Sequence, residues 1–159
     1  MPLTQGPVAR ASRRRLGFQY GCIPGDVLHG VDRRLAAAMG NREMGDAGEK
    51  AACIFLKRRG YRILNRNYRC PFGEVDIVAL RGGVLVFCEV KARSGGDLEE
   101  AMGAVDVRRQ ERMARTASHY LATEERAVKS CRFDVIALLK SGVKWKIVHV
   151  KDAFEIGEL

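Results

Sequence analysis

The stretch from residue 73 to residue 96, GEVDIVALRGGVLVFCEVKARSGG, constrains the fold more than any other segment of the chain. Two apolar runs flank the dipeptide Gly82-Gly83, and both glycines can adopt the positive φ that a two-residue hairpin turn requires. Short runs rich in Val, Ile, Leu and Phe between turn signals are typical of buried strands. The stretch therefore predicts a β-hairpin whose strands belong to the core.

Four charged residues interrupt this apolar hairpin: Glu74, Asp76, Glu89 and Lys91. With the diglycine as the turn, counting outward places Asp76 opposite Glu89. The same count places Glu74 opposite Lys91. Because side chains alternate along a strand, all four charges are expected on one face, gathered at the end of the hairpin far from the turn.

The expected pairing of Asp76 with Glu89 poses an energetic problem, because two like charges directly opposite each other are destabilising. Partial burial strengthens the repulsion, so either one carboxylate is protonated or a cation lies between the two. Oxygen ligands suit Mg²⁺ or Mn²⁺. Lys91, two residues after Glu89, reaches the same place, where it could hold a phosphate oxygen or activate a water molecule. The pattern is compatible with a centre that hydrolyses phosphodiesters.

A plainer interpretation of the same charges remains open. The charged face could be solvated, with Glu74 and Lys91 forming an ordinary cross-strand ion pair. Such exposed pairs contribute roughly 0–1 kcal/mol to stability. An Asp, a Glu and a Lys at this spacing also occur together by chance, so the spacing alone does not decide between the two interpretations.

The remainder of the chain predicts alternating helices and strands. The segment 45–60 has helical periodicity, with acidic residues in its first turn, basic residues in its last turn and Gly60 as the stop. The expected order is α-β-β-β-α-β-β, an α/β fold. The other expected elements are a strand over 61–69, the hairpin, a helix over 106–125 with Val107, Met113, Ala114, Ala117 and Leu121 on its core face, and strands over 131–140 and 143–154.

Residues 1–43 differ from the rest of the chain. They contain prolines, glycines and the basic cluster at 13–15, without sustained periodicity. We interpret them as a flexible basic extension, disordered or produced by a misassigned start, and residues 44–159 as one domain. An arm that binds nucleic acid and a tail without a role are the alternatives.

The charge and the cysteines narrow the class of protein. The formal net charge of +9 favours a polyanionic partner such as nucleic acid. The five cysteines include no CxxC pair, which argues against a disulfide framework and a zinc finger. Cys53 and Cys88 lie in apolar runs and are expected to be buried thiols, so a reducing cytoplasm is the expected location. No apolar window approaches the length of a membrane span.

The hairpin resembles a known nuclease signature. VD followed by EVK resembles the PD-(D/E)xK pattern of restriction-endonuclease-like nucleases, with Val75 in the place of the proline. Over residues 44–154 the chain resembles the YraN family of bacterial proteins, which is related to the archaeal Holliday-junction resolvases. The segments that carry this resemblance are GDAGEKAA (45–52), GYRILNRNYR (60–69), GEVDIVA (73–79), VFCEVKAR (86–93), RRQERMARTASHYL (108–121) and RFDVIAL (132–138).

The resemblance implies a restriction-endonuclease-like fold, with a mixed central sheet flanked by helices. It implies that Asp76 and Glu89 bind Mg²⁺ or Mn²⁺ and that Lys91 is the catalytic lysine. Glu49 matches a further acidic metal ligand, although a first-turn Glu is also favoured by the helix dipole. The candidates for phosphate contacts are Arg69, Arg93, Arg109 and Gln110.

Two further carboxylates, Glu74 and Asp134, are expected to have other roles. Glu74 could support the site from outside or pair with Lys91. Asp134 is expected to pair with Arg132 or another neighbouring residue rather than bind metal.

Three functions are compatible with these features. The first is a metal-dependent endonuclease that hydrolyses phosphodiester bonds in DNA, with a preference for branched DNA and, for a two-fold symmetric substrate, a homodimer. The second is a non-catalytic module that binds nucleic acid on the same fold. The third is a scaffold protein whose charged hairpin is solvated.

Overall fold

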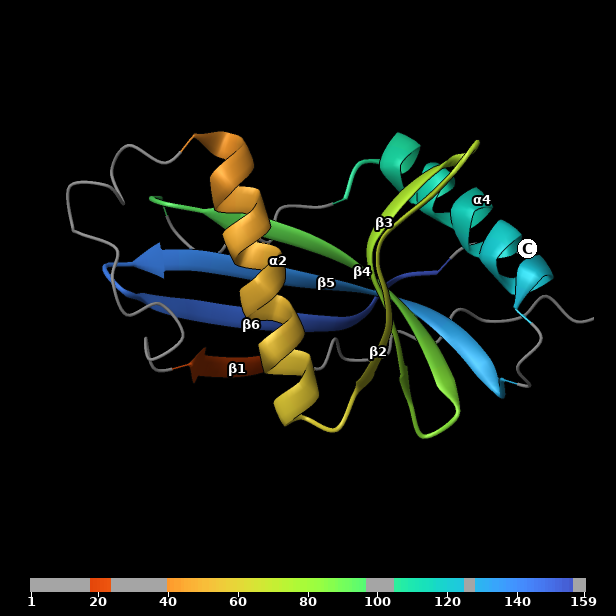
Figure 1. The fold of residues 1–159 in the computed structure, drawn as a ribbon, viewed down its shortest axis with the longest axis horizontal. Coiled ribbons are helices and arrows are strands. Elements are labelled where there is room, and N and C mark those ends of the chain that lie inside the picture. Colours follow the sequence, from red (N-terminus) through yellow and green to blue (C-terminus); the bar gives the residue numbers. More distant parts are fainter. Residues whose placement is uncertain (1–17, 24–39, 97–104, 125–127, 156–159) are drawn as a thin grey trace, which may run out of the picture.

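The computed structural model describes residues 18–23, 40–96, 105–124 and 128–155 of the 159-residue chain (Figure 1). Within them a six-stranded sheet is flanked by two helices. The elements are β1 (Phe18–Ile23), α2 (Asn41–Arg58), β2 (Arg62–Cys70), β3 (Gly73–Arg81), β4 (Val84–Arg93), α4 (Val107–Thr123), β5 (Ser130–Ser141) and β6 (Lys144–Phe154). From α2 onward, the order of these elements is the predicted α-β-β-β-α-β-β.

The sheet is mixed, as the resemblance implies. Its strand order is β1-β6-β5-β4-β3-β2. β4 and β5 are parallel, and every other neighbouring pair is antiparallel. A parallel pair needs a crossover connection, and the segment that contains α4 supplies it.

The central hairpin has the predicted register near its turn. Gly82 and Gly83 have φ values of 60° and 83°, so both occupy the left-handed region that a two-residue turn requires. The β3–β4 ladder then runs outward from the turn and ends at Ile77 and Cys88. The charged end of the hairpin lies beyond this ladder. Asp76 and Glu89 were expected to face each other as a cross-strand pair, but the paired backbone ends one residue before them.

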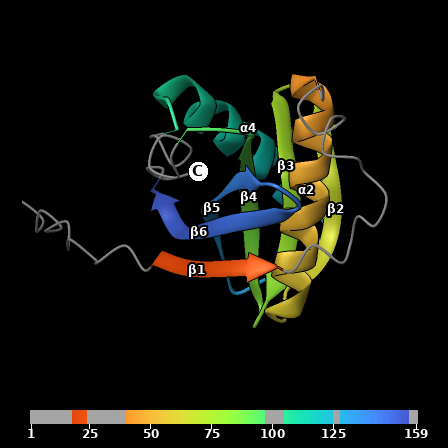
Figure 2. The ribbon, with the colours of Figure 1, turned by 90° about the vertical axis from the view of Figure 1, so that its left-hand side faces the viewer.

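The two helices cover opposite faces of the sheet (Figures 1 and 2). α2 packs on a cluster that includes Ile77 and Cys88, and α4 packs on a cluster that includes Phe87 and Phe133. Gly48 lets α2 approach β4 closely, because a Cβ at this position would overlap the Cβ of Ala92. This close approach carries the first half of α2 to the charged end of the hairpin.

Several local expectations need correction. α2 begins at Asn41, earlier than the expected residue 45. Val107 is 67% exposed rather than part of the core face, because it is the first residue of α4, directly after the capping residue Asp106. Met113, Ala114 and Ala117 are buried as predicted, and so are Cys53 and Cys88.

The strand β1 was not expected from the sequence. Residues 18–23 pair antiparallel with β6, from Phe18 opposite Val150 to Ile23 opposite Trp145. The segment FQYGCI carries a glycine in its middle and no sustained alternation, so its pattern does not predict a strand. Its partner is the edge of a sheet that exists only in the folded protein. The rest of the expected extension over residues 1–43 lies outside the described residues, apart from residues 40–43. Among the described helices, none combines the length and apolar character needed to cross a membrane.

Candidate functional site

An open pocket of about 370 Å³ lies at the charged end of the hairpin, between the first half of α2 and the start of α4. The four residues that the sequence predicts to be catalytic line it: Glu49, Asp76, Glu89 and Lys91. Gly45, Val90, Val105, Asp106 and Arg109 complete the lining. Side chains from two helices and two strands therefore meet in one place.

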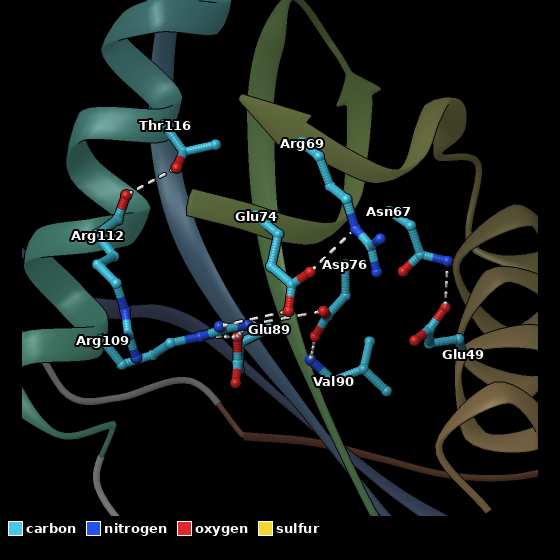
Figure 3. Close-up of polar contacts among 10 residues, drawn as sticks. All are labelled: Glu49, Asn67, Arg69, Glu74, Asp76, Glu89, Val90, Arg109, Arg112 and Thr116. Carbon is cyan, nitrogen blue, oxygen red and sulfur yellow. Dashed lines mark hydrogen bonds and ion pairs between the residues drawn. The ribbon is translucent and has the colours of Figure 1, made fainter. Parts of the chain in front are cut away.

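The guanidinium of Arg109 lies among the carboxylates (Figure 3). Its Nη2 is 2.7 Å from Glu89 Oε2 and 3.7 Å from Asp76 Oδ1. Its Nε also donates to Glu89 Oε2 at 2.9 Å, and its Nη1 lies 3.9 Å from Glu74 Oε1. Asp76 and Glu89 thus lie on the same side of the sheet and share one cation. The energetic problem seen in the sequence is met by an arginine from α4.

Arg109 lies closer to Glu89 than to Asp76, so it compensates the charge of Asp76 less well. Burial, followed by the negative charge of Glu89, raises the pKa of Asp76 to about 7. The Val90 backbone N–H donates to Asp76 Oδ2 at 2.7 Å and opposes this rise, as does Arg109 to a smaller extent. Burial acts to lower the pKa of Arg109, but the hydrogen bond and charge of Glu89 outweigh it, so that pKa is raised. A further positive charge in the pocket would lower the pKa of Asp76 and so favour its ionised form.

Lys91 lines the same pocket one residue after Val90. Burial lowers the pKa of its ammonium group, while the charge of Glu89 acts in the opposite direction. A lysine whose pKa is lowered exchanges a proton more readily near neutral pH than an exposed lysine does. The positive charge of Arg93 also lowers the pKa of Lys91, and Arg93 itself is exposed at the end of β4.

Glu49 reaches the pocket from α2, but its hydrogen bond points to β2. Asn67 Nδ2 donates to Glu49 Oε2 at 2.9 Å, and Arg66 Nη2 lies 3.9 Å from the same oxygen. Asn67 has a φ of 49°, in the left-handed region that Asn tolerates better than most residues. The charge of Glu49 contributes to the raised pKa of Asp76, although its carboxylate is directed toward β2 rather than toward Arg109 (Figure 3).

The donor set has the right chemistry for a hard cation. Asp76 and Glu89 supply carboxylate oxygens around one positive group, and Mg²⁺ sites commonly use one or two carboxylates together with water and substrate phosphate. Within the described part of the chain, no group of three or more His, Cys, Asp or Glu side chains is arranged to hold a metal ion. A divalent ion at this place would have two carboxylate ligands, Asp76 and Glu89, with Glu49 as a neighbour in the pocket.

The remaining candidates have partners within the protein. Arg69 Nε donates to Glu74 Oε2 at 3.1 Å, so Glu74 pairs with Arg69 and Arg109. Gln110 Nε2 donates to the Val105 carbonyl at 2.7 Å and so ties the segment before α4 to the helix. Gln110 thus has a structural partner, whereas Arg69, at 76% side-chain exposure, remains accessible from solvent.

Asp134 pairs with Arg132 as predicted, at 2.9 Å between Oδ1 and Nε. It also contacts His149, whose Nε2 lies 2.7 Å from Asp134 Oδ2, and this contact was not foreseen from the sequence. Asp134 and His149 are fully buried between neighbouring strands, outside the pocket lining.

Sequence reasoning missed the role of Arg109 as the shared cation and the contact between Asn67 and Glu49. A signal for the first existed: Asp106 stands just before a helical segment, and its side chain accepts from the Arg109 N–H at 2.9 Å. That cap fixes where α4 begins and so which residue of its first turn faces the hairpin. Nothing comparable in the sequence marks Asn67.

Comparisons with known proteins place these residues in a family. Residues 48–138 match the family described as "Uncharacterised protein family UPF0102". A UPF0102 protein of Moorella thermoacetica is 48% identical over 100 residues, covering 63% of this chain and 83% of that protein. A UPF0102 protein of Magnetococcus marinus is 41% identical over 117 residues, covering 73% of this chain and 94% of that protein. The matched segment contains Glu49, Asp76, Glu89, Lys91 and Arg109.

Proposed function

The chain belongs to the UPF0102 family, the YraN family of its sequence resemblance, and on that premise we propose that it is a metal-dependent endonuclease acting on DNA. One observation carries the proposal. The carboxylates of Asp76 and Glu89 approach one guanidinium nitrogen at 3.7 and 2.7 Å in a pocket that Lys91 and Glu49 also line. Two half-buried carboxylates this close together need positive charge beside them. Arg109 supplies that charge here, and a divalent ion would supply it if Arg109 turned to a phosphate that enters the open pocket.

Asp76 and Glu89 would hold Mg²⁺ or Mn²⁺, with Glu49 available from α2. The ion, when bound, would stabilise the negative charge that develops on the phosphate. Lys91 would orient the attacking water and accept its proton as the new oxygen–phosphorus bond forms and the bond to the leaving oxygen breaks. Arg109 would turn from the carboxylates to a phosphate oxygen, a ligand that guanidinium groups bind well.

The surroundings of the pocket favour a polyanionic substrate. Arg69 and Arg93 are exposed near it, and the chain carries a net charge of +9. No base-reading motif is evident in the sequence, so recognition by DNA shape, including branched DNA, is the expected mode. A two-fold symmetric branched substrate would suit a homodimer.

The decisive experiment is a cleavage assay with single-stranded, duplex, flap and four-way DNA in Mg²⁺, Mn²⁺ and EDTA. Asp76→Asn and Lys91→Ala are expected to reduce the cleavage rate by about 100-fold or more. Matched controls are Asp152→Asn and Lys146→Ala, which change the same residue types at exposed positions of β6. Asp152 has a φ of 54°, which Asn also tolerates. Both controls should keep the wild-type rate within about twofold, the scatter of a neutral surface change.

Cleavage that persists in Asp76→Asn, or that is indifferent to EDTA, would overturn the proposal. The runner-up is the non-catalytic module that binds nucleic acid, which the same Arg109 contacts favour, since they keep the carboxylates neutralised without a metal. That alternative predicts DNA binding without cleavage by the wild-type protein. It also predicts no thermal stabilisation by millimolar Mn²⁺, because stabilisation requires metal binding to the folded state.

A further inference from the structure

An exposed aromatic ring lies on the β2–β3 turn, beside α4. Phe72 is 51% exposed, an unusual degree for a phenylalanine. Its ring centroid lies 5.9 Å from that of His119 on α4, with the two planes at 57°. One side of the ring is therefore supported by the protein, while much of the rest is open to solvent.

The support beneath Phe72 is itself well fixed. The Tyr68 hydroxyl and His119 Nδ1 are 2.8 Å apart, which holds the imidazole in one orientation. Tyr68 in turn makes an edge contact with Tyr120, with centroids 4.9 Å apart, and Tyr120 is buried. An aromatic platform with this backing loses little freedom when a flat ligand stacks on it, which favours binding.

A row of arginines leads along α4 toward this platform. Arg108, Arg112 and Arg115 are all exposed and follow one another at i, i+4 and i+7, the spacing of one helical face. His119 continues the row, about 16 Å along the helix from Arg108 at 1.5 Å per residue. Glu111 is the one carboxylate between residues 107 and 119, so the face is basic on balance.

The row and the candidate pocket are adjacent. Arg109 lines the pocket, and its neighbour Arg108 opens the row. Near the other end, the backbone turns back at Gly73, where a Cβ would meet Thr116 and Arg112. A chain of phosphates could therefore run from the pocket along α4 to the aromatic ring.

We propose that this α4 face binds a single-stranded stretch of nucleic acid, with phosphates on Arg108, Arg112 and Arg115 and an unpaired base stacked on Phe72. A base inside a duplex has both faces covered by its neighbours, whereas an unpaired base has a free face. Arginines that follow a backbone beside an exposed aromatic ring are the combination that binds single strands. The inference rests on the proposed function in one respect: the α4 face would bind the unpaired part of a branched or flap DNA substrate.

The test measures binding in EDTA, so that it does not depend on hydrolysis. Fluorescence anisotropy with a labelled thymidine 12-mer is compared with a 12-base-pair duplex, for the wild type, Phe72→Leu and Phe72→Trp. Leucine keeps the apolar contact with His119 but has no ring face for stacking. We expect Phe72→Leu to weaken single-strand binding about tenfold, with duplex binding unchanged within about twofold, and Phe72→Trp to bind at least as well as the wild type. A uridine 12-mer distinguishes RNA from DNA as the source of the unpaired base.

The alternative role of Phe72 is to fasten the β2–β3 turn to α4. That role predicts that Phe72→Leu changes single-strand and duplex binding alike, or changes neither, and either result would overturn the proposal. A second probe uses 2-aminopurine within the oligonucleotide. Its fluorescence should be quenched on the wild type and not on Phe72→Leu, and quenching of equal strength on both proteins would also contradict stacking.

The salt dependence tests the arginine row separately. Removing one arginine that binds a phosphate should reduce the slope of log K against log salt by about 0.7 for a single strand. Arg115→Gln should show this reduction. Arg62→Gln, a change of an exposed arginine at the other end of β2, should not. Equal slopes for Arg115→Gln and the wild type would remove α4 from the binding path. Because these measurements need no cleavage, a protein that binds as expected but never cuts would refute only the endonuclease proposal.

Discussion

Two aspartates occupy nearly identical sequences and opposite electrostatic environments. Residues 75–80 read VDIVAL and residues 133–138 read FDVIAL, with Asp76 on β3 and Asp134 on β5. Each lies near an arginine and close to buried apolar neighbours. Yet the pKa of Asp76 is raised to about 7, while that of Asp134 is lowered from its ordinary value.

The difference lies in the number of donors. Burial would raise the pKa of Asp134, but hydrogen bonds from His149 and Arg132 outweigh it. Arg132 donates to both carboxylate oxygens, at 2.9 and 3.1 Å, and the Asp152 backbone N–H donates at 3.0 Å. Asp134 is fully satisfied by the protein and belongs to its structural framework.

Asp76 has fewer donors and a competing negative charge. One backbone N–H donates to it, its arginine stands 3.7 Å away, and that arginine is held more closely by Glu89. A carboxylate that accepts hydrogen bonds from several donors stabilises the fold. A carboxylate with few donors and a like charge beside it would be stabilised by an added cation. The comparison thus separates a structural aspartate from a candidate ligand within one sheet.

The largest expected effect on stability comes from neutralising Asp134, and neutralising Asp76 is the matched comparison. Asp134→Asn removes the fully buried negative partner of the half-buried Arg132 and of the buried His149, and breaking such a pair costs about 3–5 kcal/mol in the free energy of unfolding. Asp76→Asn removes a charge that its surroundings disfavour, so above pH 7 it should leave stability equal to or above that of the wild type. Urea denaturation at pH 8 measures both, and equal losses for the two variants would break the comparison.

The pH dependence of stability should differ in direction between the two aspartates. The folded-state pKa of Asp76 is raised, so its contribution is present below about pH 4 and is lost as the pH rises through about 7. The folded-state pKa of Asp134 is lowered. Its contribution to stability is therefore present above the unfolded pKa of about 3.9 and is lost as the pH falls through the lower folded-state pKa.

The unfolding free energy of the wild type should therefore fall by on the order of 2–4 kcal/mol between pH 4 and pH 8 relative to Asp76→Asn. Parallel pH profiles of the two proteins, measured by urea denaturation, would show that Asp76 titrates normally.

The smallest effect is expected at the edge of the pocket. Glu74 is 45% exposed and pairs with Arg69, which is 76% exposed, so solvent screens the pair. Glu74→Gln should change the unfolding free energy by less than about 1 kcal/mol, and less still in high salt. A loss above about 2 kcal/mol, measured by the same denaturation, would mean that its contact with Arg109 matters more than burial indicates.

Much of the fold was predictable because it depends on local patterns. The diglycine fixed the turn and the register of β3 and β4 as far as Ile77 and Cys88. Helical periodicity and the buried thiols were also predicted correctly. The edge strand β1 was not, because its pairing depends on β6 and not on any pattern of its own.

The candidate site was predictable only in part. Alternation along the hairpin placed Asp76 and Glu89 on one face, and the structure has both beside Arg109. Glu74 contacts Arg69 and Arg109, and the hairpin pattern predicted neither of these partners. Those arginines come from β2 and α4, and the angle at which a helix meets a sheet is not written in the spacing of one hairpin.

The amino-acid sequence by itself determined which residues could form strands, where the hairpin turns, and that two carboxylates would share one face. Only the tertiary structure decided which aspartate is satisfied and which is left short of donors, because donors arrive from strands and helices distant in the chain. Alternation and turn chemistry act over a few residues, whereas the electrostatic balance at a buried carboxyl depends on every element packed around it.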